Sequence, residues 1–150
     1  MVQVPGLIAD IGATNARFAL ADDKGVYDEQ VLKCTDYPSL LEAARAYLDD
    51  VKMGTPPQTA AVAIAGPVTG DSFSMTNHPW HFSVRETREA LGLKRLNFMN
   101  DFKALALAVP RLTSSDIRQI GSGKAIEKMP IGIIGPGTGL GVASLVWTNA

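Results

Sequence analysis

The chain has 150 residues, of which 46% are hydrophobic and 19% are charged, a composition typical of a globular protein. Fourteen basic and fifteen acidic residues leave a net charge of −1, so we expect neither a nucleic-acid nor a membrane partner. One cysteine excludes an internal disulfide and a cysteine-based zinc site, and the lack of a leader or membrane-span pattern predicts a cytoplasmic protein.

The first stretch with chemical character is a predicted hairpin near the N-terminus. An apolar run carries the carboxylate of Asp10, Gly12 permits a sharp reversal, and residues 16–20 form a second predicted strand. Thr14 and Asn15 place small hydrogen-bonding groups at the tip, where they and the backbone amides can hold phosphate oxygens. Asp10 can hold a hydrated magnesium ion. An ordinary hairpin with turn-forming residues explains the same pattern.

The next elements alternate between strands and a helix. Ser39 with Glu42 three residues later is a capping box that opens a helix, and a small-apolar run further on is typical of a strand buried on both faces. The predicted elements are strands at residues 16–21 and 26–33, a helix from residue 40 to about residue 48, and a strand at residues 59–65. This order predicts the opening of a ribonuclease-H-like α/β domain.

The middle of the chain is less regular. Residues 72–75 form a short predicted strand after a turn, and an irregular stretch leads to Trp80. His78 and His81 are the only histidines, and we interpret both as loop residues beside an anchoring Trp80 and not as metal ligands. Ser83 begins a second capping box, whose helix should end near Gly92.

A strand at residues 95–99 is followed at once by Asn100 and Asp101, and a helix is predicted at residues 102–109. The two polar residues therefore lie where the carboxyl end of a strand meets a helix, which is where ligands bind in open α/β sheets. Helix capping accounts for one of them. The second favours a binding or catalytic site.

Pro110 is interpreted as the end of a first domain, residues 1–110, and residues 111–150 as the beginning of a second. A short buried strand at residues 131–134 leads into alternating glycines at residues 135–141, which let backbone amides approach a phosphate. The spacing fits neither the dinucleotide fingerprint nor the P-loop. Thr138 lies in this second loop as Thr14 lies in the first, so the two hairpins can bind the two ends of a nucleotide's phosphate chain.

These motifs resemble the phosphate loops of sugar kinases in the actin, hexokinase and Hsp70 superfamily, and most closely the bacterial glucokinase family. The resemblance covers nearly the whole chain and is carried by the residue blocks 10–17, 63–68, 75–80, 100–102 and 135–141. It implies an actin-type ATPase lobe with a mixed β-sheet, followed by the first strands of a second, similar lobe. It also implies ATP-dependent phosphorylation of glucose in the complete protein, with Mg²⁺ as cofactor and a homodimer as the assembly.

The resemblance also implies roles for single residues. Asp101 would be the general base for the sugar's 6-hydroxyl group, and Asp10 would orient the magnesium ion through water. The remaining sugar-binding residues would be Asn100, Gly66, Pro67 and Asn77, and the phosphate-binding residues would be Gly12, Ala13, Thr14, Asn15, Gly137, Thr138 and Gly139.

Two departures from the family pattern stand out. Ala13 replaces the usual glycine, so we expect an ordinary negative φ or slight strain there. The family's Gly-Glu-Gly-Gly-His block and a further glutamate are absent, so we expect the chain to be a fragment lacking part of the sugar and adenosine sites. A kinase for another hexose or an amino sugar, a sugar-sensing regulator and a non-catalytic partner-binding lobe are the alternative functions.

Overall fold

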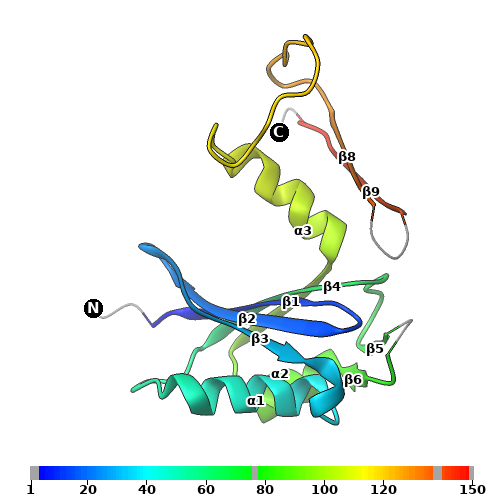
Figure 1. The fold of residues 1–150 in the computed structure, drawn as a ribbon. Coiled ribbons are helices and arrows are strands. Elements are labelled where there is room, and N and C mark those ends of the chain that lie inside the picture. Colours follow the sequence, from blue (N-terminus) through cyan, green and yellow to red (C-terminus); the bar gives the residue numbers. More distant parts are fainter. Residues whose placement is uncertain (1–3, 76–77, 137–139, 149–150) are drawn as a thin grey trace. The chain divides into compact units, whose positions relative to one another are not determined.

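A computed structural model describes residues 4–75, 78–136 and 140–148 (Figure 1). The chain forms two compact units, Met1–Asp101 and Phe102–Ala150. Among the described residues, no helix has the length and apolarity needed to span a bilayer.

The first unit is built on a five-stranded mixed sheet with the order β3-β2-β1-β4-β7. The strands β1, β2 and β3 are antiparallel neighbours, whereas β1, β4 and β7 run parallel. Their bounds are Gly6–Ile11 for β1, Asn15–Asp22 for β2, Gly25–Lys33 for β3, Thr59–Ile64 for β4 and Arg95–Asn100 for β7. The predicted strands are confirmed, with ends displaced by no more than a residue or two.

Two helices, α1 (Leu40–Val51) and α2 (Val84–Ala90), lie on the same side of this sheet (Figure 1). Buried and more exposed residues alternate along β1, which explains the core between the sheet and these helices. Leu7 and Ile11 are buried in that core, whereas Asp10 on the opposite face of the sheet is exposed. Buried aromatic rings complete the core, and Phe18 of β2 stacks on Tyr47 of α1 with centroids 5.4 Å apart.

Both predicted capping serines begin their helices. The Ser83 hydroxyl group accepts a hydrogen bond from the Glu86 amide at 3.1 Å, as a capping box requires. Ser39 departs from that pattern, because its hydroxyl group accepts from the Leu41 amide and donates to the carboxylate of Glu42. The Ser39 cap therefore binds the backbone amide of Leu41 in place of that of Glu42, and it contacts Glu42 through the carboxylate.

A small hairpin, β5 (Ser72–Ser74) with β6 (His81–Ser83), is joined to the main core by Trp80. The Trp80 indole is buried, donates its Nε1–H to the carbonyl oxygen of Tyr37 at 3.0 Å, and contacts the His78 ring edge-on. The interpretation of Trp80 as an anchor is confirmed. His81 differs from the prediction, because it lies in β6 and pairs with Ser74 in the ladder rather than in a loop.

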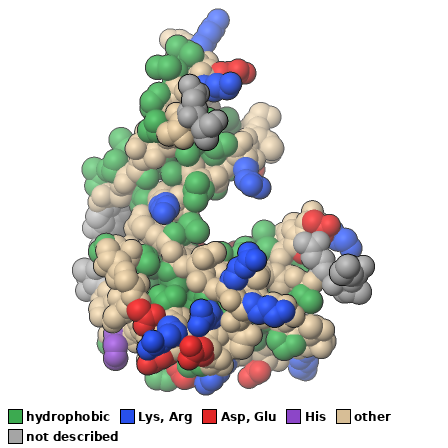
Figure 2. Space-filling view, turned by 180° about the vertical axis from the view of Figure 1, so that it is seen from behind, with side chains coloured by type: hydrophobic (Ala, Val, Ile, Leu, Met, Phe, Trp, Pro, Cys, Tyr) green, Lys and Arg blue, Asp and Glu red, His purple; other side chains and the backbone are tan. Residues whose placement is uncertain are grey.

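The second unit contains most of α3 (Asp101–Ala108), a 3₁₀ turn at Val109–Arg111, and the hairpin β8 (Ile131–Pro136) with β9 (Leu140–Leu145). Hydrophobic side chains reach its surface, and they are visible in the upper part of the space-filling view (Figure 2). Ile120 is 93% exposed, and Leu140 is 70% exposed. The compact units divide before Phe102, so α3 groups with the hairpin. The assignment of residues 1–110 and 111–150 to two enzyme lobes stays a prediction.

Tyr47 provides a test of the first unit's core. Its hydroxyl group donates to the Asp28 carbonyl oxygen at 3.0 Å, and burial, with the nearby Asp28 charge, raises the pKa of Tyr47 to about 12. The neutral phenol therefore stabilises the fold below about pH 10, and this contribution is lost as pH rises toward 12.

We expect Tyr47→Phe to lower the free energy of unfolding at neutral pH by about 1 kcal/mol, because the carbonyl oxygen loses its donor. We also expect the variant to lose less stability than the parent between about pH 10 and pH 12. Urea unfolding across that range measures both effects, and parallel pH profiles for the two proteins would contradict the assignment.

Candidate functional site

The parallel strands bring three predicted site segments to one edge of the sheet. Ile11 of β1 pairs with Ile64 of β4, and Ile64 pairs with Asn100 of β7, so the three strand ends form one row. The residues that follow each strand therefore emerge at the same carboxyl edge. This row brings together the first loop, at residues 12–15, with Gly66, Pro67, Asn100 and Asp101.

Asn100 connects two of these segments through its side-chain amide. Its Nδ2 donates to the carbonyl oxygen of Gly66 at 3.2 Å and to Oδ1 of Asp101 at 2.8 Å. Gly66 has φ of +129°, a conformation that side chains disfavour, so a glycine is needed where β4 turns toward Asn100. All three residues are partly buried, which favours fixed geometry for the Asp101 carboxylate.

Asp10 lies on the exposed face of β1, directly opposite Arg17 in the ladder with β2. Arg17 Nη1 lies 3.1 Å from Asp10 Oδ2, and about half of each side chain is exposed. Exposed ion pairs of this kind contribute little to stability. A carboxylate that keeps water around it is the oxygen donor that a hydrated magnesium ion takes, so Asp10 fits the predicted metal role.

The first loop is a tight reversal closed by its own backbone. The Gly12 amide donates to the Asn15 carbonyl oxygen at 2.9 Å. Ala13 is not among the described residues with positive φ, so the expectation of ordinary backbone geometry there is confirmed. Thr14 is exposed at the tip, and Asn15 is the first residue of β2.

Cys34 is a supporting residue that the sequence did not reveal. It is buried beneath the first loop, at the start of a 3₁₀ turn. Its amide donates to the Thr14 carbonyl oxygen at 2.9 Å, and its thiol donates to the Gly12 carbonyl oxygen at 3.3 Å. Burial raises the pKa of the Cys34 thiol, which keeps it in the protonated form that can donate. No sequence signal links it to a loop twenty residues earlier.

Some predicted site residues lie outside the described part of the chain. These are Asn77 and the tip of the second glycine loop, Gly137, Thr138 and Gly139. The strands that flank this tip do form the predicted hairpin, in which Gly135 pairs with Gly141. The two phosphate hairpins belong to different compact units, and their opposition across a nucleotide stays a prediction.

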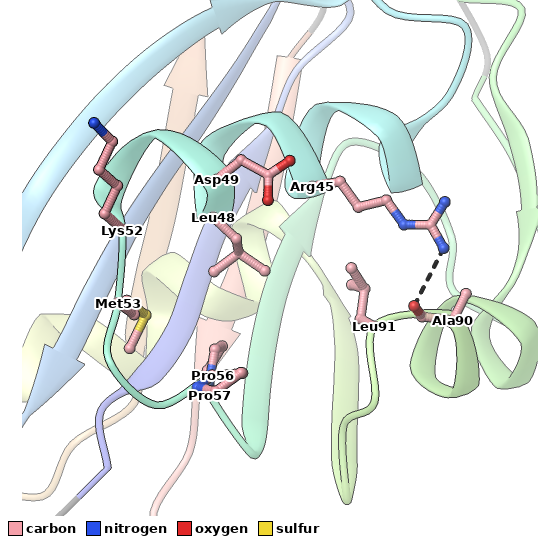
Figure 3. A pocket seen from close by; sticks show the side chains of 9 residues that line it. All are labelled: Arg45, Leu48, Asp49, Lys52, Met53, Pro56, Pro57, Ala90 and Leu91. Carbon is pink, nitrogen blue, oxygen red and sulfur yellow. Dashed lines mark hydrogen bonds between the residues drawn. The ribbon is translucent and has the colours of Figure 1, made fainter.

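A separate groove of about 370 Å³ lies between the carboxyl ends of α1 and α2 (Figure 3). Its lining residues include Pro57, just before β4, and Leu91, which precedes β7, so the groove is at the amino edge of the parallel strands. Arg45 closes one side with a hydrogen bond from Nη2 to the carbonyl oxygen of Ala90 at 3.3 Å. The groove and the predicted site therefore occupy opposite edges of the sheet.

Comparison with known proteins agrees with this arrangement. The family model described as Glucokinase matches residues 7–150. The chain belongs to the glucokinase family. It is 50% identical over 147 residues to the glucokinase of Neisseria meningitidis serogroup C, a match that covers 97% of this chain and 44% of that protein. The chain spans 22–44% of the length of the curated relatives it matches.

Two solved structures of glucokinases confirm the predicted fold class, the mixed α/β fold of actin-like ATPases. A glucokinase from an Antarctic psychrotroph superposes with a TM-score of 0.86 at 40% identity, over 97% of this chain and 47% of that one. A ROK family glucokinase from Streptomyces griseus, in complex with glucose and AMPPNP, gives a TM-score of 0.69 at 18% identity, over 95% of this chain and 44% of that one. At that identity the second likeness shows the fold alone.

The Cys34 contacts predict a measurable effect on the first loop. We expect Cys34→Ala to lower the free energy of unfolding by about 1 kcal/mol and to accelerate amide exchange at Gly12, because one of the carbonyl groups that fix the turn loses its donor. Hydrogen exchange followed by NMR measures the effect. Cys34→Ser, which keeps a donor, is the matched control, and unchanged Gly12 exchange in the alanine variant would contradict the assignment.

Proposed function

We propose that this chain supplies two parts of an ATP-dependent glucokinase. These are the general base that accepts a proton from the sugar and the first phosphate-binding loop. The enzyme would transfer the γ-phosphoryl group of ATP to the 6-hydroxyl group of glucose. The observation that carries the proposal is the row Ile11–Ile64–Asn100, which brings the ends of β1, β4 and β7 to one edge in a member of this family. The glucose and AMPPNP in the S. griseus structure support the choice of substrates.

Asp101 is the proposed general base. Phosphoryl transfer requires little from a protein beyond positioning, charge neutralisation and a residue that accepts the proton of the attacking hydroxyl group. The new bond joins the sugar's O6 to phosphorus while the bond from phosphorus to ADP breaks, and the proton passes to the Asp101 carboxylate. The Asn100 amide, bound to Oδ1 of Asp101 and to the Gly66 carbonyl oxygen, would hold that carboxylate in place.

The remaining roles follow the same edge of the sheet. Asn100 would also bind ring hydroxyl groups, and Gly66, Pro67 and Asn77 would line the sugar site. Asp10 would hold Mg²⁺ through water, and the ion would neutralise charge on the phosphate oxygens. The residues proposed to bind the phosphates are Gly12, Ala13, Thr14 and Asn15 in the first loop, and Gly137, Thr138 and Gly139 in the second.

The proposals for the compartment, the assembly and the small-molecule partners of the enzyme rest on the family resemblance. We propose that the full-length protein works in the cytoplasm as a homodimer, with ATP and a hexose as its small-molecule partners. An amino sugar or another hexose is the competing substrate class, because it would present the same primary hydroxyl group to Asp101.

A chimaera tests the function directly. This chain would replace the matching 44% of the N. meningitidis glucokinase, with which it shares 50% identity. A coupled assay for glucose 6-phosphate, repeated with mannose and amino sugars, measures turnover and preference. We expect glucose to give the highest kcat/KM. Absence of turnover in a folded chimaera would overturn the proposal, and preference for another sugar would overturn the choice of glucose.

Substitution of Asp101 tests the proposed base. We expect Asp101→Ala in the chimaera to lower kcat by about a hundred- to ten-thousandfold, because it removes the carboxylate that Asn100 holds and that would accept the proton. Asp49→Ala, which alters an aspartate in the groove at the opposite edge, is the control and should keep its kcat. Near-normal turnover of Asp101→Ala would remove Asp101 from the mechanism.

Asp10 should act through the metal and not through the sugar. We expect Asp10→Asn to raise the Mg²⁺ concentration needed for half-maximal turnover while glucose affinity measured by calorimetry stays unchanged. The exposed pair with Arg17 contributes little stability, so a folding defect should not obscure the result. Weakened glucose binding with normal magnesium dependence would contradict the role.

The chain by itself should not phosphorylate glucose at a measurable rate. It spans less than half of the relatives it matches, and catalysis requires the sugar hydroxyl group to be held in line with the γ-phosphate with water excluded. The coupled assay on the purified 150-residue chain measures this. Turnover that Asp101→Ala abolishes would show that these residues are sufficient.

A further inference from the structure

Two glycines of the second hairpin face each other across the ladder. Gly135 of β8 pairs with Gly141 of β9, and the two flank the proposed phosphate-binding residues 137–139, two residues away along each strand. In the sequence these glycines suggested room for a phosphate. The structure gives a different reason why both positions need a glycine, and this reason is steric.

The ring of Phe102 occupies the space that side chains at both positions would need. A methyl group on Gly135 would lie 2.6 Å from Cζ of Phe102, and one on Gly141 would lie 1.8 Å from Cε2. Both values are below the 3.0 Å that real Cβ contacts respect. Gly132, on the same strand β8, has no atom within 4 Å of a methyl group placed there, so among the described glycines of the hairpin only the pair that contacts the ring shows this steric demand.

This contact lies within the second unit and joins α3 to the hairpin. Glycine has no side chain that can move aside, so an aromatic ring packed directly against two glycines fixes how close its helix comes to the strands. In this way the Phe102 ring fixes the separation and the register of α3 and the β8–β9 hairpin. Phe102 is the second residue of α3 and follows Asp101, the proposed base, directly. The proposed base and the ring that contacts the second phosphate hairpin are therefore neighbouring residues of the chain.

We propose that Phe102 is a positioning residue that sets the β8–β9 hairpin on α3, so that the nucleotide phosphates are held in a fixed relation to the helix that begins at Asp101. This inference rests on the proposed function. It assigns Gly135 and Gly141 to the ring contact, and it leaves the phosphates to residues 137–139.

The contact can be measured by NMR on the 150-residue chain. We expect the Hα resonances of Gly135 and Gly141 to carry a ring-current shift that disappears in Phe102→Leu, while Gly132 is unchanged. We also expect Gly141→Ala to accelerate amide exchange at Ile133 and Ala143, which pair within the same ladder. This acceleration should be much smaller in a Phe102→Ala background, where the added methyl group has room. Gly132→Ala is the matched control.

The positioning role needs a kinetic measurement in the chimaera. We expect Phe102→Leu to raise the KM for MgATP about ten- to a hundredfold, because the β8–β9 hairpin loses its contact with the ring. We expect the KM for glucose to stay unchanged, because the proposed sugar site lies at the carboxyl edge of the sheet and does not include this contact. Additive effects of the Phe102 and Gly141 substitutions, or an unchanged KM for MgATP, would overturn the inference. Failure of the proposed function is distinct, because the parent chimaera would then show no turnover.

Discussion

The arrangement of the candidate site depends on the parallel pairing of β1, β4 and β7. Their register aligns Ile11, Ile64 and Asn100 in one row, and each strand then delivers its polar residues to the same edge. A shift of one residue in any strand would turn its side chains to the opposite face. The buried side chains of β1 and β4, packed beneath α1 and α2, therefore fix the position of the residues proposed to do the chemistry.

Much of this arrangement could be predicted from the sequence, because its signals are local. The alternating pattern of β1, the Ser83 cap and the polar residues after β7 each act over a few residues, and the structure confirms the elements that they predict. The ends of the strands also follow from such signals. A row of strand ends at one edge then follows from general rules of open α/β sheets.

The contacts between distant segments could not be predicted in this way. Cys34 supports the first loop from twenty residues away, and Phe102 reaches glycines more than thirty residues further on. No local sequence pattern predicts either contact, because a cysteine at a strand end and a phenylalanine in a helix are both ordinary core residues. The glycines of the second hairpin show the same limit, because one residue type serves close backbone approach to a phosphate and close approach of a ring.

We propose that the carboxyl edge of β1, β4 and β7 receives the metal–nucleotide complex. Paramagnetic broadening by Mn²⁺–ATP, measured by NMR on the glucose-bound chimaera, tests it most directly. We expect the strongest broadening at Asp10, Gly12 and Asn100, and no broadening of the resonances of the groove between α1 and α2. Broadening centred on Arg45 and Lys52 in that groove, with the carboxyl edge unchanged, would contradict it.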